Sequence, residues 1–328
     1  MSTISGGQLH CSPIRILCTK SIEDVSRLLG EQLYSGNVPA AGWGNVADDT
    51  SSLRLHTDTR PTPGRPAVYP PSQSIPQPRL KARYYWDAAD VKATRILGAD
   101  VDKCRTHMLN AVDLVLVPEI SGKSYIGVVT TRVEKELSQY IEPGFRQAFA
   151  EVESSALVQF DVLESMFQSD FYLWLLYRYD GESQLSDDLN LEIIRSVRSK
   201  DRLARGSSLT SGAEMDRADL AALVSGENQF GPAQFGIYDA SIDLSLELEL
   251  HPDGSFQIIV GSSDYDDRFE RSVKGTKLVD DTAFVVLPKL RDAYESDATW
   301  PSPGLGQLRE RAVSVLQAHV TASGDNSE

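Results

Sequence analysis

The chain has 328 residues, with 32 Lys and Arg against 47 Asp and Glu, and its formal net charge is −15. Apolar residues make up 41% of the chain and charged residues 24%, which argues against a disordered, collagenous or coiled-coil protein. A chain of this length buries most of its surface on folding, so one large domain or two medium domains would fit without disulfides. Composition alone selects no function.

The cysteines and the hydropathy of the chain bear on its compartment. Cys11, Cys18 and Cys104 are an odd number without CxxC spacing, and in a reducing cytosol they can be small core residues. No apolar run reaches the roughly 18–20 residues of a membrane-spanning helix. The first twenty residues lack the basic start and apolar block of a secretory signal. We therefore expect a cytoplasmic protein that does not span a membrane.

Charge is distributed unevenly along the chain. Residues 51–110 carry 10 basic and 5 acidic side chains, whereas residues 211–328 carry 9 basic and 21 acidic side chains. The acidic C-terminal third would repel a phosphate backbone, which disfavours wrapping of the whole molecule around nucleic acid. A local nucleic-acid contact through residues 51–110 remains open.

The N-terminal part predicts a small β–α unit. Residues 13–18 alternate like a strand, and Ser21 is placed to cap a helix that runs to about Tyr34 and ends at Gly36. Seven of the sixteen prolines lie between Pro61 and Pro78. Because proline removes a backbone donor and fixes φ, we expect residues 60–79 to form an extended spacer or a segment draped over the surface. The predicted organisation is a unit at 1–59, the proline-rich spacer, a main domain at 80–321, alternatively split near residue 150, and a polar tail at 322–328.

The main domain predicts interleaved strands and helices. Its expected strands lie at 80–86, 111–117, 124–130, 189–197, 242–250, 255–260 and 284–287. Its expected helices lie at 88–109, 145–167, 216–224 and 304–320, while 171–179 could be either a strand or a helix. Turns at 121–123 and 252–254 would close two antiparallel hairpins. The fold class that follows is α+β, with a mixed or antiparallel sheet and flanking helices.

Nucleotide and zinc motifs are weak. Gly122-Lys123-Ser124 resembles the end of a phosphate loop, but Val117 stands where the loop needs its first glycine, so we interpret it as a hairpin turn. Cys104 and His107 would lie one helical turn apart and could supply two zinc ligands, yet no second pair completes a site. We favour a buried cysteine beside a half-exposed histidine. No GxSxG motif marks a nucleophile.

Two clusters of aspartates could hold Mg²⁺ if their loops met in space, because hard oxygen ligands suit that ion. Their members are Asp264, Asp266 and Asp267, and Asp280 and Asp281. A nuclease of the restriction type also needs Asp/Glu-x-Lys on a strand, and Asp90-Val91-Lys92 falls instead at a predicted helix start. The alternative is that both groups are solvated acidic loops.

Two basic clusters could bind a partner. One combines cations with aromatic rings, as single-strand binding proteins do; its members are Arg79, Lys81, Arg83, Tyr84, Tyr85 and Trp86. The other is a run of cations, Arg195, Arg198, Lys200, Arg202 and Arg205. The alternative for both is ion pairing with the acidic C-terminal third of this chain.

Two hypotheses of function remain. The first is a binding or scaffold protein without intrinsic catalysis that acts as a subunit of a larger assembly and has a protein partner, with no cofactor. The alternative is a Mg²⁺-dependent enzyme of the nuclease kind, which processes nucleic acid or nucleotides with the five aspartates above as catalytic residues.

Overall fold

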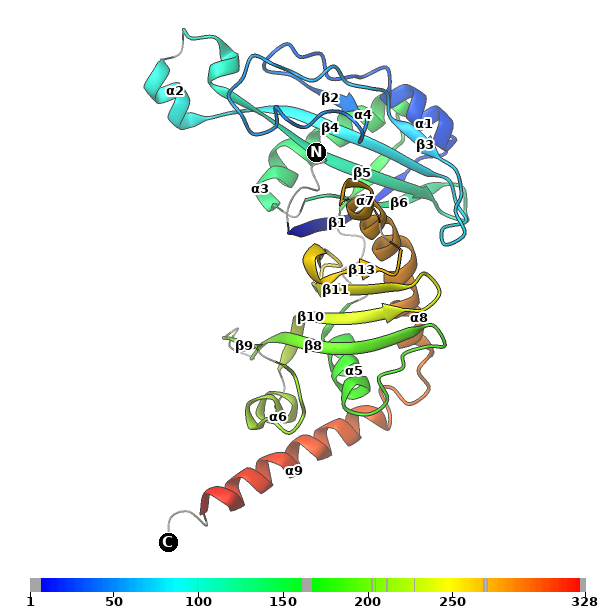
Figure 1. Ribbon diagram of the computed structural model, residues 1–328, viewed down its shortest axis with the longest axis vertical. Helices are drawn as coiled ribbons and strands as arrows, with labels where there is room; N and C mark the ends of the chain where they lie inside the picture. The colour runs from blue at the N-terminus through cyan, green and yellow to red at the C-terminus, as the bar shows by residue number, and fades with distance from the viewer. Residues whose placement is uncertain are drawn as a thin grey trace. The chain divides into compact units, whose positions relative to one another are not determined.

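The computed structural model describes residues 7–324, except residues 99, 132, 161–166, 202, 204, 211, 227, 268 and 270. The chain folds into two compact units. Unit 1 comprises Met1–Val162 and Glu270–Asp281, and unit 2 comprises Leu163–Phe269 and Thr282–Glu328. Each unit combines antiparallel strands with helices (Figure 1), which confirms the predicted α+β class.

The sheet of unit 1 is antiparallel in every pairing. Its strands are β1 (Gln8–Leu17), β2 (Ala41–Gly44), β3 (Ala67–Tyr69), β4 (Arg79–Ala89), β5 (His107–Pro118), β6 (Ser124–Val129) and β7 (Leu157–Gln159). They run in the order β2-β4-β5-β6-β1, with β3 also paired to β4 and β7 to β1. The predicted β5–β6 hairpin is confirmed, since Leu116 pairs with Gly127 across it.

Some helices of unit 1 pack on its sheet and complete the core. They are α1 (Ile22–Leu29), α2 (Val91–Leu97), η1 (Lys103–Arg105), α3 (Glu134–Glu136), η2 (Leu137–Ile141), α4 (Glu142–Val152) and α7 (Arg271–Asp281). Apolar residues of α1 and α4 join one face of the sheet in a single core, where the Trp43 ring lies 5.1 Å from Tyr84 and 4.9 Å from Phe145. Ser21 caps α1 as predicted, but the helix ends at Gly30 rather than Gly36.

Unit 2 has a second antiparallel sheet, in the order β12-β11-β10-β8-β9 with β13 paired to β11. Its strands are β8 (Leu189–Lys200), β9 (Gly206–Thr210), β10 (Gln229–Asp239), β11 (Leu244–Leu250), β12 (Phe256–Ile259) and β13 (Asp264–Tyr265). Its helices are α5 (Ser169–Asp180), α6 (Ala218–Ser225), η3 (Val260–Ser262), η4 (Thr282–Val286), α8 (Leu287–Ser296) and α9 (Gly304–Gly324). Helix α5 packs on β8 and β10, and α9 packs on α5 and α6. The predicted β11–β12 hairpin is confirmed by the pairing of Leu248 with Ile258.

Three predicted elements are wrong. The helix expected at 88–109 is only α2, because β4 and β5 extend to pair Ala89 with His107, and Gly98 ends the helix at a φ of 88°. The strand expected at 284–287 is helical, since short apolar runs do not separate buried helix from strand. The helix expected at 145–167 is α4, which begins earlier, with Pro143 in its first turn, and ends at Val152; residues 161–166 lie outside the described residues.

The proline-rich residues 60–79 belong to unit 1, where β3 pairs with β4. Prolines donate no backbone hydrogen bond but their carbonyls accept, and the Ser26 hydroxyl donates to the Pro66 carbonyl over 2.9 Å. Ile75 is buried. The segment therefore covers part of unit 1. The other predicted domain limits stay predictions.

None of the helices in the described ranges is long and apolar enough to cross a membrane.

Candidate functional site

Strand β4 presents two chemically different faces, because successive side chains point to opposite sides of a strand. Its apolar face lies in the core of unit 1 and consists of Leu80, Ala82, Tyr84 and Trp86. Its opposite face consists of Arg79, Lys81, Arg83, Tyr85 and Asp87. Arg79 is partly buried and the other four residues of this face are buried, so the charged side chains need partners inside the unit.

The centre of the polar face is a saturated arginine. The Arg83 guanidinium donates from Nε and Nη2 to the two carboxylate oxygens of Asp113, over 2.7 and 3.2 Å. It also donates to the backbone carbonyls of Asp48 and Val46, over 2.9 and 2.8 Å. Burial opposes the charge of Arg83, but the Asp113 carboxylate raises its pKa above the ordinary value. Arg83 is fully buried and therefore has a structural role.

Next along the strand, Lys81 meets a carboxylate from the far end of the sequence. Helix α7 brings Asp280 to within 2.6 Å of the Lys81 ammonium, although the two residues are 199 positions apart. The Lys81 ammonium also lies over the Tyr69 ring, 5.1 Å from its centroid. The side chains of Lys81 and Asp280 are only 6% and 8% exposed. This pair ties α7 to the polar face of β4.

A cavity of about 670 Å³ lies beside this pair, within unit 1. We call it the β4–α7 cavity. Its polar and charged lining residues are Asp48, Tyr69, Ser72, Ser74, Arg79, Lys81, Thr276, Lys277, Asp280 and Asp281. Its volume is in the range of small-molecule sites. Three cations and three carboxylates line it, so its formal charge sums to zero.

Two buried polar atoms at the wall of the cavity make no hydrogen bond to any described residue. They are Arg79 Nε and Asp280 Oδ1. The rest of the Arg79 guanidinium is fixed, because it donates to the Pro70 carbonyl and to the Ser72 hydroxyl. Burial raises the pKa of Asp280, and the charges of Lys81 and Arg79 offset this only in part. Arg79 Nε lies 3.9 Å from Asp280 Oδ2, within ion-pair distance but too far for a hydrogen bond, so a donor and an acceptor without hydrogen bonds to the described residues lie side by side near the cavity.

The structure brings together two groups that the sequence analysis kept apart. Arg79 and Lys81 came from the basic cluster, and Asp280 and Asp281 came from the carboxylate pair. Protein-family models and curated proteins were searched and gave no match to this chain. Tyr69 and Lys277 were missed, because nothing in the sequence signals that α7 returns to β4.

The aromatic part of the predicted nucleic-acid contact is buried. Tyr84 and Trp86 belong to the main core of unit 1, and Tyr85 packs with Tyr34 and Leu109. A base cannot stack on these rings in the folded unit. The cations Arg79 and Lys81 line the β4–α7 cavity instead, and nucleic-acid binding by them stays a prediction.

The second basic cluster lies on β8 and after it, in unit 2. Arg195 pairs with Glu247 over 2.8 Å and Arg198 with Glu249 over 3.3 Å, and both arginines are half-exposed. Arg205 pairs with Asp201 over 2.7 Å. Arg195 and Arg198 therefore form ion pairs with glutamates of the acidic C-terminal third, which was the alternative to partner binding. Lys200 is exposed at the end of β8, and Arg202 lies outside the described residues.

The five predicted metal-binding aspartates divide between the units. Asp264, Asp266 and Asp267 are exposed on and after β13 in unit 2. Asp280 and Asp281 are buried at the end of α7 in unit 1, where Lys81 and Lys277 approach them over 2.6 and 2.5 Å. A shared Mg²⁺ site stays a prediction. The Asp90-Val91-Lys92 triplet lies at the start of α2, as predicted, with Asp90 as the N-cap.

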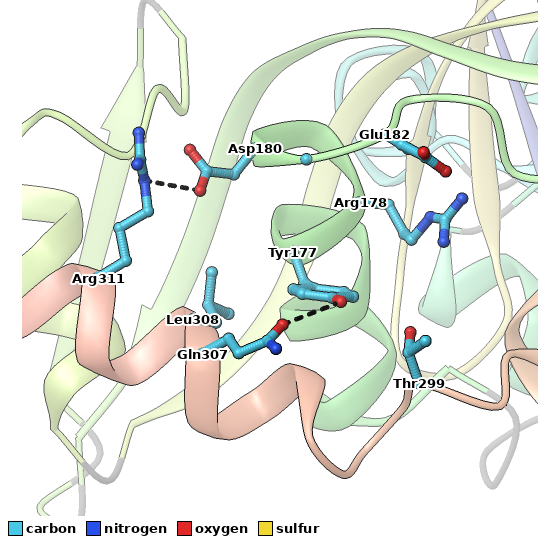
Figure 2. A pocket seen from close by; sticks show the side chains of 9 residues that line it. Tyr177, Arg178, Asp180, Glu182, Thr299, Gln307, Leu308 and Arg311 are labelled. Carbon is cyan, nitrogen blue, oxygen red and sulfur yellow. Dashed lines mark hydrogen bonds and ion pairs between the residues drawn. The ribbon is translucent and has the colours of Figure 1, made fainter.

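Unit 2 contains a smaller cavity of about 390 Å³ between α5 and α9 (Figure 2). Tyr177 on α5 donates from its hydroxyl to the Gln307 side chain on α9 over 3.3 Å, and the Asp180–Arg311 ion pair over 2.7 Å closes one side. Burial raises the pKa of Asp180, although Arg311 opposes the shift. These contacts join α5 to α9. The side chains of Tyr177, Gln307, Asp180 and Arg311 therefore have structural partners within unit 2.

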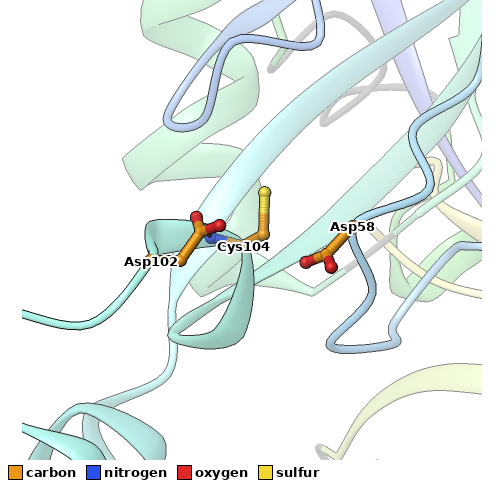
Figure 3. A group of neighbouring side chains, drawn as sticks. All are labelled: Asp58, Asp102 and Cys104. Atoms are coloured by element: carbon orange, nitrogen blue, oxygen red, sulfur yellow. Dashed lines mark hydrogen bonds between the residues drawn. The ribbon is translucent and has the colours of Figure 1, made fainter.

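One group of three side chains in unit 1 has the spacing of metal ligands. One ligand atom each of Asp58, Asp102 and Cys104 lies within 4.8 Å of the others (Figure 3). His107 is not a member of this group, and its Nδ1 contacts the Lys103 carbonyl and the Thr106 hydroxyl. Burial and Asp102 raise the pKa of the Cys104 thiol, which disfavours the thiolate. Cys104 is half-buried, not buried as we expected.

Proposed function

We propose that this protein is a binding subunit of a larger assembly, without chemistry of its own, and that the β4–α7 cavity holds its small-molecule ligand. The observation that supports this proposal is the buried Lys81–Asp280 pair at the wall of a hollow. A buried ion pair stabilises a fold no better, in general, than apolar residues of the same volume. Buried charges at the wall of a cavity are therefore better explained by ligand binding than by a contribution to stability.

The charges of the cavity indicate the class of ligand. Arg79 and Lys81 on β4 attract a negative group, whereas Asp280 and Asp281 on α7 attract a positive group. Because the lining sums to zero, neither a dianion nor a dication gains from the net field. The proposed ligand is a small zwitterion, such as an amino acid or an aminoalkyl phosphate.

The lysines at the carboxylates argue for binding rather than metal chemistry. The ammonium groups of Lys81 and Lys277 lie where a Mg²⁺ ion would approach the oxygens of Asp280 and Asp281. A Mg²⁺ ion, which takes several oxygen ligands at once, would have to displace both ammonium groups, whereas the ammonium group of a zwitterion needs only Asp280 Oδ1, which accepts no hydrogen bond from any described residue. We place the protein in the cytoplasm, because all three cysteines are free thiols, with Cys11 and Cys18 in the core.

The experiment is a binding assay on the full chain with defined probes. Glutamine and phosphoethanolamine serve as zwitterions, and inorganic phosphate and glucose as contrasts, measured by calorimetry and by the shift of the melting temperature. The proposal predicts that a zwitterion binds and stabilises the wild type, and that phosphate and glucose do not. Lys81→Met and Asp280→Asn should each remove this binding.

The control is a matched pair in unit 2. The Lys289 ammonium lies 2.8 Å from both carboxylate oxygens of Asp239, which is fully buried. Lys289→Met disrupts a lysine–aspartate pair whose aspartate is buried and which lies away from the β4–α7 cavity, so it should keep ligand binding. Failure of both zwitterions to bind the wild type would contradict the proposal, as would binding that survives Lys81→Met.

A further inference from the structure

We propose that α2 is a docking surface for an acidic, leucine-containing segment of a partner protein. The surface, which we call the α2 patch, consists of Val91, Lys92, Arg95, Ile96 and Leu97. It lies at the far end of β4 from the β4–α7 cavity, in the connection to β5 (Figure 1). It is therefore a second site, separate from the proposed ligand site.

The apolar side chains of the α2 patch are unusually exposed. Val91 is 68% exposed, Ile96 80% and Leu97 44%, and no residue of α2 is buried. Asp90 nevertheless fixes the start of the helix, because its carboxylate accepts the backbone N–H groups of Lys92 and Ala93. A formed helix without a buried face presents its aliphatic side chains to a partner.

The cations of the patch indicate the charge of that partner. On a helix, residues four apart are neighbours, so Val91 lies next to Arg95 and Lys92 next to Ile96. Within the described part of the chain, no ion pair engages Lys92 or Arg95. They contrast with the paired cations of β4 and β8. An acidic segment would neutralise both cations while its leucines cover the aliphatic side chains.

A protein fits this surface better than nucleic acid or a second copy of the chain. A phosphate backbone would pair with the cations but leave Val91 and Ile96 exposed to water. A second copy docking α2 on α2 would bring Lys92 and Arg95 against the same cations, which is unfavourable. An acidic peptide that also carries leucines satisfies both kinds of side chain.

The test uses synthetic 16-residue peptides and the full chain, with fluorescence anisotropy at low and high salt. The first peptide carries four Glu and four Leu at helical spacing, the second has Lys in place of Glu, and the third has Ser in place of Leu. We expect only the first to bind, more weakly at high salt. The variants Ile96→Ser and Lys92→Glu/Arg95→Glu should each weaken binding about tenfold, which is about 1.4 kcal/mol.

The control variant Ile120→Ser/Lys123→Glu changes an exposed aliphatic residue and a cation at the β5–β6 turn of the same unit, and it should leave the affinity within about twofold. Four outcomes would overturn the proposal. They are no binding of the first peptide, equal binding of the peptide without leucines, equal binding of single-stranded oligo-dT, and self-association in sedimentation velocity that Ile96→Ser abolishes.

Discussion

Strands β4 and β8 both carry arginine and lysine at short intervals, yet the structure uses these cations in different ways. On β4, Arg83 is fully buried and is held by the Asp113 carboxylate and two backbone carbonyls. On β8, Arg195 and Arg198 are half-exposed and lie on the surface of their sheet beside Glu247 and Glu249. The difference comes from what covers each strand.

The covering segments of β4 come from distant parts of the sequence. Residues 45–75 and helix α7 lie over its polar face and supply carbonyl groups and Asp280. Nothing comparable in the described residues of unit 2 covers Arg195. The same residue type is therefore a structural element in one unit and a solvated surface group in the other, which variants can test directly.

The largest expected effect is the loss of Arg83. Arg83→Met removes the guanidinium that pairs with the buried Asp113 carboxylate, and we expect it to lower the free energy of unfolding by about 3–5 kcal/mol. The matched variant Arg195→Met should lower it by at most about 1 kcal/mol, since Arg195 is half-exposed and the Gln234 side chain also donates to the buried Glu247 carboxylate. Urea unfolding measures both. Equal losses would show that the two strands do not differ as the structure indicates.

The next effect is a pH dependence at Asp280. Burial raises its pKa in the folded state, so the folded protein binds a proton more readily than the unfolded chain. Its contribution to stability is fully present below the unfolded pKa of about 3.8 and is lost as the pH rises through the raised folded pKa. Relative to Asp280→Asn, the wild type should gain stability as the pH falls from 7. A flat difference between the two unfolding curves would contradict the raised pKa.

Salt sharpens the comparison further. Ions screen exposed charges but reach buried pairs much less. The small destabilisation of Arg195→Met should therefore shrink towards zero in 1 M NaCl, whereas that of Arg83→Met should stay nearly constant. Unfolding of both variants at low and high salt checks this, and a parallel response of the two would argue against burial as the cause.

The smallest effect concerns a carboxylate that is exposed. The Thr19 backbone N–H donates to Glu153 over 2.7 Å, and such hydrogen bonds lower the pKa of Glu153 to about 2. The stability that it contributes is present above the unfolded pKa of about 4.5 and is lost as the pH falls through about 2. Carboxyl NMR titration measures this value directly. A pKa near 4.5 would mean that the Thr19 contact does not form in solution.

Local patterns predicted the features that neighbouring residues determine. The β11–β12 hairpin follows from alternation around a Pro-Asp-Gly turn, and the cap at Ser21 follows from one side chain and the next helical turn. The strand at β4 was predicted, and Arg79 and Lys81 were recognised as part of a basic cluster at its start. In each case the residues that determine the element lie within a few positions of it in the sequence.

Long-range placement could not be predicted. A period-two pattern does not reveal whether the polar face of β4 is covered, and Lys81 and Asp280 are 199 residues apart. Proline content suggested a spacer or a draped surface segment at 60–79, and it did not indicate that carbonyl groups of that segment accept hydrogen bonds from α1 and β4. The β4–α7 cavity depends on both of these placements, so its chemistry was out of reach.

Lysine ammonium NMR gives the most direct test of the proposed ligand site. The ammonium signals of Lys81 and Lys289, assigned by substitution, are followed as phosphoethanolamine or glutamine is added to the full chain. Both lysines are held by buried aspartates, but only Lys81 lines the β4–α7 cavity. The account predicts that the Lys81 signal moves and saturates while the Lys289 signal stays in place. An unchanged Lys81 signal, or equal movement of both, would contradict it.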